Sequence, residues 1–308
     1  MSQGLVLVTG ADGFVGTHLV RHLREMGDEV VGVDRTHDDH VDITDAAAVR
    51  DLVARIRPRA IYHLAGWADV GGSWKAPVES FRVNAEGTMN VLAAATEAGV
   101  ERVLAVSSAD VYGKVDPSEL PLTELSPLRP ASPYAVSKVA ADYLGLQAWL
   151  GRGLPVLRVR AFNHLGPGQT DKFVAPALAS RIARAERDGG DVLPIGDLSA
   201  RRDFTDVRDV VRAYRLLMER GEPGEVYNVC SGVDLAVQEL ADQLLAQARI
   251  PLRFETDPEL LRPVEVPVLR GSHERLTAAT GWEPEIPISQ TLTDLLEDWR
   301  ARVAAEAT

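Results

Sequence analysis

A glycine-rich turn close to the start of the chain constrains the fold more than any other feature. The segment TGADGFVG contains Gly10, Gly13 and Gly16, and it joins the apolar run Leu5–Val8 to Phe14–Met26, where apolar residues recur at helical spacing. Gly10 permits a tight turn, Gly13 lets a backbone approach a pyrophosphate, and Gly16 allows close packing of a helix on a strand. The helix N-terminus then offers free N–H groups to phosphates. The turn predicts a dinucleotide-binding unit, although an ordinary glycine-rich turn can share this spacing.

The first half of the chain alternates short apolar runs with stretches of helical periodicity. Further strands are expected at Val30–Val33, Ala60–Leu64, Arg102–Val106 and Pro155–Val159, and helices at Ala46–Ile56, Pro77–Ala98 and Pro133–Leu150. Such alternation predicts an α/β fold of the Rossmann type, a doubly wound parallel sheet with helices on both faces.

The rhythm changes after Asn163. Helices are expected at Lys172–Arg187 and Asp206–Glu219, a strand at Glu225–Val229, and two short helices near the C-terminus. We therefore predict a dinucleotide-binding Rossmann domain of residues 1–163 plus about 206–230. Residues of about 164–205 and 231–308 are expected to form a smaller C-terminal α/β substrate lobe.

Further cofactor contacts are expected where the next two strands end. Asp34 closes the second strand about 20 residues after the turn, where a carboxylate accepts hydrogen bonds from the adenosine ribose. Arg35 follows at once and could meet a 2′-phosphate, so both NAD(H) and NADP(H) stay open. The other predicted contacts are Phe14 and Val15 at the helix start, Asp42 and Ile43 at the adenine, and Leu64, Ala65 and Gly66 along the groove.

Tyr134 and Lys138 lie four residues apart in SPYAVSK, so one helical face carries both. A nearby ammonium favours phenolate, and we expect Lys138 to lower the pKa of Tyr134. Ser107 and Ser108 end a strand at the sheet edge where open α/β folds bind ligands. A serine hydroxyl there could hold a substrate oxygen, so all four residues are predicted to be catalytic. Alone, such a Tyr–Lys pair is more often a solvated helix face.

Composition excludes several classes of protein. The net charge of −12 argues against nucleic-acid binding, which needs clustered Lys and Arg. The single cysteine, Cys230, cannot form an intramolecular disulfide, and we expect it to be buried. No apolar run approaches the roughly 18 residues of a membrane span. We expect a cytoplasmic protein that binds neither membranes nor metals.

These motifs, in their order along the chain, carry a family resemblance. TGADGFVG, Asp34, HLAG, Asn84, SSADVYG and YAVSK resemble the extended short-chain dehydrogenase/reductase family over essentially the whole length. The resemblance implies an NAD(P)-dependent oxidoreductase whose C-terminal lobe binds a nucleoside-diphosphate sugar. It also implies a structural role for Asn84 and a homodimer formed through the segments Pro77–Ala98 and Pro133–Leu150.

The second half resembles the branch of this family that acts on GDP-mannose derivatives, through AFNHLGPGQ, RRDFTDVRDVVRAY, YNVCSG and LRPVEVPVLRG. By this resemblance, Asn163 contacts the sugar or its phosphate and Arg202 the nucleotide end. Arg262 and Glu265 hold the diphosphate and the guanosine ribose; without the resemblance they would be a surface pair. The remaining predicted substrate contacts are Ser108, Ala109, Asp110, Tyr134 and Val174.

Two reactions of this branch compete. Reduction of the 4-keto group of GDP-4-keto-6-deoxy-D-mannose to GDP-D-rhamnose needs only Ser, Tyr, Lys and a hydride donor. A GDP-mannose 4,6-dehydratase needs a further acid/base carboxylate, and here Ala109 cannot transfer a proton while Asp110 is one methylene shorter than the usual Glu. We expect the reduction. The dehydratase, another sugar-nucleotide reductase or epimerase, and a catalytically silent dinucleotide sensor are the alternatives.

Overall fold

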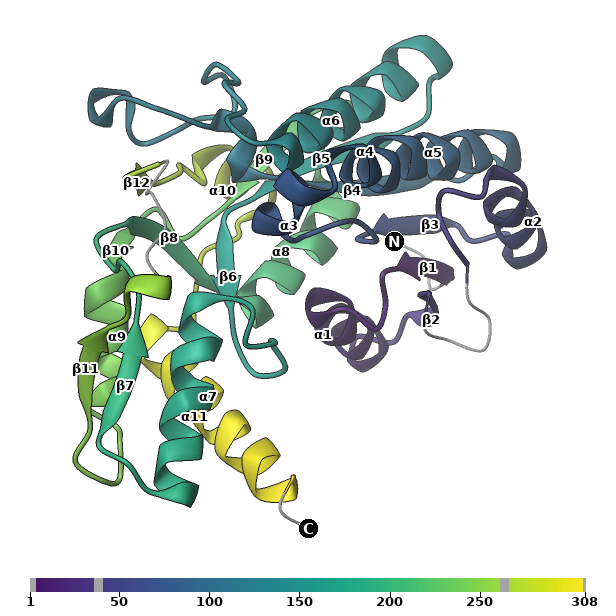
Figure 1. Ribbon diagram of the computed structural model, residues 1–308. Coiled ribbons are helices and arrows are strands. Elements are labelled where there is room, and N and C mark those ends of the chain that lie inside the picture. Colours follow the sequence, from purple (N-terminus) through teal and green to yellow (C-terminus); the bar gives the residue numbers. More distant parts are fainter. Residues whose placement is uncertain (1–3, 36–40, 261–265, 307–308) are drawn as a thin grey trace.

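The computed structural model describes residues 4–35, 41–260 and 266–306. A six-stranded parallel sheet runs through its centre in the order β2-β1-β3-β4-β5-β9 (Figure 1). The strands are β1 (Leu5–Thr9), β2 (Glu29–Val33), β3 (Ala60–His63), β4 (Arg102–Ser108), β5 (Val156–Ala161) and β9 (Val226–Val229). The strand order changes direction at β1: the chain passes from β1 outward to β2 on one side and then returns to β3 on the other. This puts the glycine turn at the switch point where such sheets bind ligands. The predicted Rossmann-type fold is confirmed.

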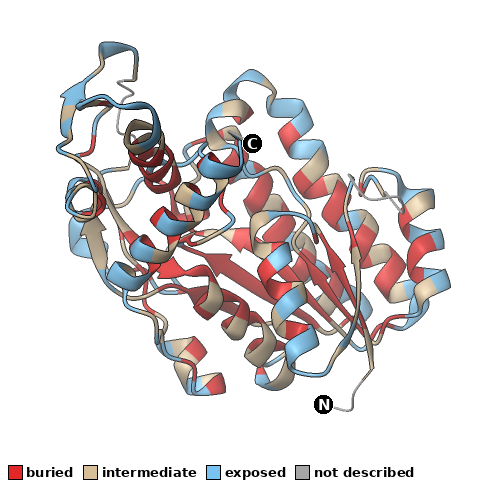
Figure 2. Cartoon of the chain, turned by 90° about the horizontal axis from the view of Figure 1, so that it is seen from below, coloured by how far each residue is buried: buried red, intermediate tan, exposed pale blue. Residues whose placement is uncertain are grey.

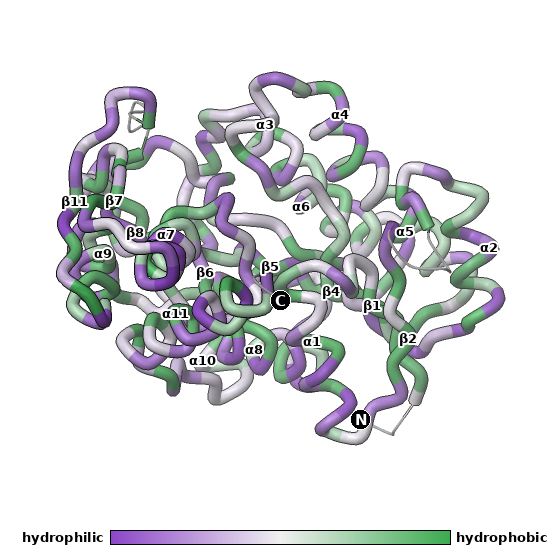
Figure 3. The backbone as a smooth tube through the Cα atoms, turned by 60° about the horizontal axis from the view of Figure 1, so that its bottom comes forward, coloured by the Kyte–Doolittle hydropathy of each residue, from purple (hydrophilic) through white to green (hydrophobic). Residues whose placement is uncertain are grey.

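Helices cover both faces of this sheet because its strands are apolar on both sides (Figure 2). On one face lie α1 (Phe14–Glu25), α8 (Val207–Arg220) and α10 (Glu274–Thr280); on the other lie α2 (Ala46–Ile56), α5 (Gly87–Ala98) and α6 (Pro133–Arg152). Along α2, hydrophobic and hydrophilic residues alternate with the helical period (Figure 3). No helix within the described ranges is long and apolar enough to cross a membrane.

The predicted single helix over Pro77–Ala98 is interrupted. It consists of α4 (Pro77–Phe81), a π-helical turn over Arg82–Glu86 and then α5. π-helical turns within helices are frequent at functional sites, and this one carries the buried Asn84. A short helix, α3 (Val70–Lys75), precedes α4 and packs against α6.

The second half of the chain adds short strands that periodicity did not predict. Beyond the main sheet, β8 (Arg201–Asp206) pairs with β6 (Asn163–Leu165), β10 (Asp234–Ala236) and β12 (Val268–Leu269), and β7 (Val192–Ile195) pairs with β11 (Arg253–Thr256). The helices α7 (Val174–Asp188), α9 (Val237–Leu245) and α11 (Ile288–Ala305) share an apolar core with them. The last helix was expected to be short, but its 18 residues lie along α7.

Candidate active site

Two glycines of the glycine-rich turn have no room for a side chain. Gly10 has a φ of +74°, and a Cβ there would lie 2.7 Å from the backbone nitrogen of Ala65. A Cβ on Gly16 would lie 2.0 Å from the carbonyl oxygen of Gly10, so α1 packs on β1 only with glycine. Gly13 is the N-cap of α1, which has no side-chain cap and no acidic residue in its first turn. The free N–H groups at Phe14 and its neighbours therefore suit the pyrophosphate of a dinucleotide.

The predicted adenosine end lies at the tip of β2. The Asp34 carboxylate accepts hydrogen bonds from the backbone nitrogens of Asp12 (3.3 Å) and Arg35 (2.7 Å), while the Arg35 side chain is exposed. Asp42 is exposed as well, and hydrogen bonds from Thr44 lower its pKa. These groups surround the place that an adenosine ribose takes in a Rossmann fold.

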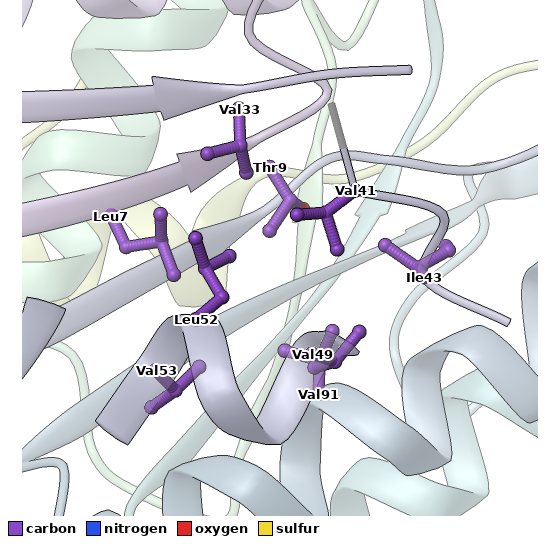
Figure 4. A pocket seen from close by; sticks show the side chains of 9 residues that line it. All are labelled: Leu7, Thr9, Val33, Val41, Ile43, Val49, Leu52, Val53 and Val91. Atoms are coloured by element: carbon purple, nitrogen blue, oxygen red, sulfur yellow. The ribbon is translucent and has the colours of Figure 1, made fainter. Parts of the chain in front are cut away.

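Ile43 is less accessible than expected for an adenine contact. Its side chain is buried and, with Val41, lines a small apolar cavity against β1, α2 and α5 (Figure 4). A Cβ on Gly87 would lie 2.5 Å from Ile43 Cδ1, which shows how closely the two elements approach. The Ile43 side chain therefore belongs mainly to the core behind the predicted adenine site.

The last three residues of the HLAG segment, Leu64–Gly66, are held beside the glycine turn by β1. The backbone nitrogen of Leu64 donates to Thr9 O (3.2 Å) and that of Ala65 to Thr9 Oγ1 (3.3 Å). The preceding His63 bridges Thr9 Oγ1 (2.8 Å) and Thr88 Oγ1 (3.1 Å). Burial lowers the pKa of His63 to about 3, so it is a neutral brace. Its bracing role was not predicted, because both partners are distant in sequence.

Tyr134 and Lys138 lie on the buried face of α6, as their spacing predicts. The Lys138 Nζ atom is 6.0 Å from the centroid of the Tyr134 ring and donates to the carbonyl oxygen of Val106 (3.1 Å). Ser132 caps the helix by accepting from the backbone nitrogen of Ala135. The pair thus faces the end of β4.

The two serines at the end of β4 have different partners. Ser107 is buried, and its Oγ donates to the carbonyl oxygen of Lys138 (3.0 Å), so it holds α6 against the sheet. Ser108 hydrogen bonds with the Tyr134 phenol and reaches Asp110 Oδ2 at 3.3 Å. This placement favours Ser108 over Ser107 as the hydroxyl that meets substrate, because side chains alternate along a strand.

The pKa of Tyr134 departs from the expectation. Burial raises it and the Asp110 carboxylate raises it further, whereas the hydrogen bond from Ser108 lowers it. The net pKa of Tyr134 is therefore raised by desolvation of the phenol, and the expected lowering by Lys138 stays a prediction. A phenol held in its protonated form suits a proton donor.

Burial also lowers the pKa of Lys138, to about 8. Between this value and the unfolded value of 10.5, the unfolded chain binds more protons at this position than the folded one, so folding gains stability as pH rises through that window. We expect the free energy of unfolding of the wild type to rise by about 3 kcal/mol relative to Lys138→Met between pH 8 and pH 10.5. Denaturant titrations of both proteins at several pH values measure this difference, and a constant difference would contradict a buried lysine.

Of the substrate-binding residues predicted from the sequence, some lie within the described part of the chain and some outside it. Arg202, on β8, donates to the carbonyl oxygens of Arg201 (2.8 Å) and Pro267 (3.4 Å); burial lowers its pKa, and Asp110 acts in the opposite sense. The structure thus brings Arg202 to the side of the site that holds Asp110. Asn163 is exposed at the start of β6 and Val174 is half-exposed at the start of α7. Arg262 and Glu265 lie outside the described residues.

Asn84 connects three segments around the site. Its Oδ1 accepts from the backbone nitrogen of Trp67 (2.8 Å), and its Nδ2 donates to Trp67 O (3.2 Å) and to Ser137 Oγ (2.8 Å). A buried amide with these partners braces the loop after β3 against α6.

The structure bears on two further kinds of reactive site, a nucleophilic cysteine and a metal centre. Cys230 is buried at the end of β9, and burial raises the pKa of its thiol well above the usual value, which disfavours a nucleophilic thiolate. Among the residues with described positions, no cluster of three or more His, Cys, Asp or Glu could hold a metal ion.

Comparison with known proteins identifies the family. The sequence profile described as GDP-mannose 4,6 dehydratase matches residues 7–295. The chain belongs to the GDP-mannose 4,6-dehydratase family. It is 41% identical to GDP-6-deoxy-D-mannose reductase from Pseudomonas aeruginosa, over 99% of this chain and 100% of that protein. This agrees with the resemblance to one branch of the extended short-chain dehydrogenases/reductases.

Solved structures of the wider fold superpose along nearly the whole chain. The structure of RMD from Pseudomonas aeruginosa complexed with NADPH has a TM-score of 0.90 and 40% identity, and the match covers 97% of this chain and 100% of that one. UDP-glucose 4-epimerase from Thermus thermophilus, in complex with NAD, has a TM-score of 0.86 and 29% identity over 96% of this chain and 99% of that one. Members with different reactions thus share this backbone, and side chains decide the chemistry.

Proposed function

We propose that this member of the family is an NAD(P)H-dependent reductase that converts the 4-keto group of GDP-4-keto-6-deoxy-D-mannose to the alcohol of GDP-D-rhamnose. The observation that carries the proposal is the Tyr134 phenol, buried beside Ser108 and Lys138 at the sheet edge next to the glycine turn. The similarity to the Pseudomonas aeruginosa GDP-6-deoxy-D-mannose reductase supports the substrate. Related structures with NADPH or NAD support the cofactor.

The residues present fit a bound dinucleotide, since the uncapped N-terminus of α1 suits its pyrophosphate and the Asp34 carboxylate suits its adenosine ribose. When bound, the nicotinamide supplies the hydride for the keto carbon. Ser108 Oγ holds the keto oxygen by a hydrogen bond, and Tyr134 donates its phenolic proton to that oxygen as the new C–H bond forms. Lys138, as the ammonium form, then stabilises the phenolate that remains until a proton returns from solvent.

A second candidate, the 4,6-dehydratase, is favoured by one observation. Asp110 lies within 3.3 Å of Ser108 Oγ, and a carboxylate near this position could serve as the additional base. Against it, Ala109 is buried and has no proton to transfer. Incubation with the ketosugar and NADPH, compared with incubation with GDP-mannose alone, separates the two. Loss of absorbance at 340 nm only with the ketosugar supports the reductase, and turnover of GDP-mannose without cofactor consumption supports the dehydratase.

The choice between the two reduced cofactors depends on neighbouring residues of opposite charge. Asp34 would repel the 2′-phosphate of NADPH, whereas Arg35 would attract it. We expect Asp34→Ser to raise the ratio of kcat/KM for NADPH to that for NADH about tenfold, a difference of about 1.4 kcal/mol. The matched variant Arg35→Ser should lower the ratio. Steady-state kinetics with each cofactor measure both, and a ratio that neither substitution changes would contradict this assignment.

We further propose the division expected from the sequence, in which residues 1–163 and about 206–230 bind the dinucleotide while the remaining residues bind the sugar nucleotide. A homodimer is proposed through α4, α5 and α6. Their outer surface carries an apolar groove that includes Phe81, Met89 and Tyr143, which are each about half exposed. Light scattering after gel filtration tests for the dimer. The cytoplasmic location stays a prediction.

A further inference from the structure

The N-terminal turn of α6, the helix that carries Tyr134, needs hydrogen-bond acceptors for its free N–H groups. Pro133 has no N–H. The backbone nitrogen of Ala135 donates to Ser132 Oγ (3.1 Å), and that of Val136 to Ser132 O (3.0 Å). Ser132 therefore provides no acceptor for the backbone N–H of Tyr134, a residue that is buried.

Ser73 provides the missing acceptor from a segment 61 residues earlier. Its Oγ lies 3.2 Å from the backbone nitrogen of Tyr134 and 2.6 Å from the carbonyl oxygen of Val70. A hydroxyl has a single proton, and the carbonyl of Val70 can only accept it. The Ser73 oxygen is therefore an acceptor toward Tyr134. Ser73 is fully buried, so water cannot replace it.

A second connection joins the same two segments. Asn84 binds both backbone groups of Trp67, before α3, and donates to Ser137 Oγ, which in turn donates to the carbonyl oxygen of Tyr134 (2.6 Å). Both the N–H and the C=O of Tyr134 are thus bonded to side chains that the α3 segment helps to hold. In Figure 1, α3 lies beside the start of α6, and the two helices are in contact.

We propose that Ser73 is a positioning residue for proton transfer: it caps α6 from α3 and thereby sets where the Tyr134 phenol meets the keto oxygen. The inference rests on the reductase function proposed above. Ser73 acts through the backbone of Tyr134, since its only hydroxyl proton is used by Val70.

The expected effect follows from geometry. Without the Ser73 hydroxyl, the Tyr134 N–H is buried and unsatisfied, and the first turn of α6 shifts to find another partner. A misplacement of about 1 Å at a reacting group can cost about a hundredfold in rate. The turn is still held by Ser132 and Ser137, so we expect a smaller loss in Ser73→Ala, of about tenfold in kcat.

The chain offers a matched control in Ser80 on α4. It is also fully buried, but its Oγ has no hydrogen-bond partner among the described residues. Ser80→Ala therefore removes the same atom from the same helical layer without removing a cap. We expect Ser73→Ala to lower kcat about tenfold while KM for NADPH changes less than twofold, and Ser80→Ala to leave both unchanged.

Hydrogen exchange of the Tyr134 amide, followed by mass spectrometry on the peptide that contains it, is the second measurement. We expect faster exchange in Ser73→Ala than in the wild type and in Ser80→Ala. Equal kcat in the two alanine variants, or equal exchange of the amide, would overturn the proposal. If the wild type does not reduce the ketosugar, the reductase function fails by itself, and the exchange experiment still decides whether Ser73 holds α6.

Discussion

Substitution of Tyr134 by Phe is expected to lower kcat for reduction of the ketosugar by about a thousandfold, within the range that general acid catalysis contributes. The variant loses only the phenolic oxygen. The phenol is the group that the structure holds in its protonated form beside Ser108, because burial and the Asp110 carboxylate raise its pKa. Without it, the developing alkoxide must take a proton from water, which the buried site admits poorly.

The same helix carries a control. Tyr143 lies on the outer face of α6, in the groove proposed above as the dimer interface, so Tyr143→Phe removes an identical oxygen outside the active site. Stopped-flow or steady-state loss of NADPH absorbance measures both variants, and a binding titration with NADPH checks that the cofactor site is intact. Retention of more than a tenth of the wild-type kcat in Tyr134→Phe would exclude this phenol as the acid.

Substitution of Asp142 by Ala is expected to destabilise the fold by about 3–5 kcal/mol, the usual result of removing one partner from a buried ion pair. Asp142 lies one turn after Lys138 on α6 and is fully buried. Its two oxygens accept hydrogen bonds from Arg158 Nη1 (2.6 Å) and Arg160 Nε (2.8 Å) on β5. Alanine leaves both guanidinium groups buried without their carboxylate.

Denaturant titration with a spectroscopic readout measures this loss. The contrasting variant is Glu119→Ala, which removes an exposed carboxylate bonded to Arg129 at 2.6 Å. Although this ion pair is as short, water screens it, and we expect almost no change in the unfolding midpoint. Similar midpoints for the two variants would mean that Asp142 does not stabilise the junction of α6 and β5.

The predictions from sequence were most accurate where the signal is local. Strand–helix alternation predicted the six strands of the main sheet, and a spacing of four residues correctly put Tyr134 and Lys138 on one helical face. The strands outside the main sheet were missed. Five of them have only two to four residues, too few to show a period, and the sixth, β8, is the mostly polar segment RRDFTD. The π-helical turn around Asn84 was missed because the apolar pattern continues through it.

Contacts between residues far apart in the sequence could not be predicted from the spacing of residue types. The sequence predicted catalytic roles for Ser107 and Ser108 alike, and only their partners separate them: Ser107 bonds to the backbone of α6, while Ser108 reaches the phenol. Ser73 had no signal, since a serine in a glycine-rich segment resembles any loop residue. Its partner lies 61 positions away.

The sequence by itself determined the class of this protein. The features that define this class are local in sequence. They are glycines that tolerate no Cβ, an acidic residue at the end of the second strand and a Tyr–Lys pair at helical spacing. Only the tertiary structure decided how the catalytic pair is protonated. The pKa of Tyr134 depends on how deeply the ring is buried and on Asp110, and both depend on how α6 packs against β4. Burial and contact are properties of the folded chain, because they arise between segments that only folding brings together.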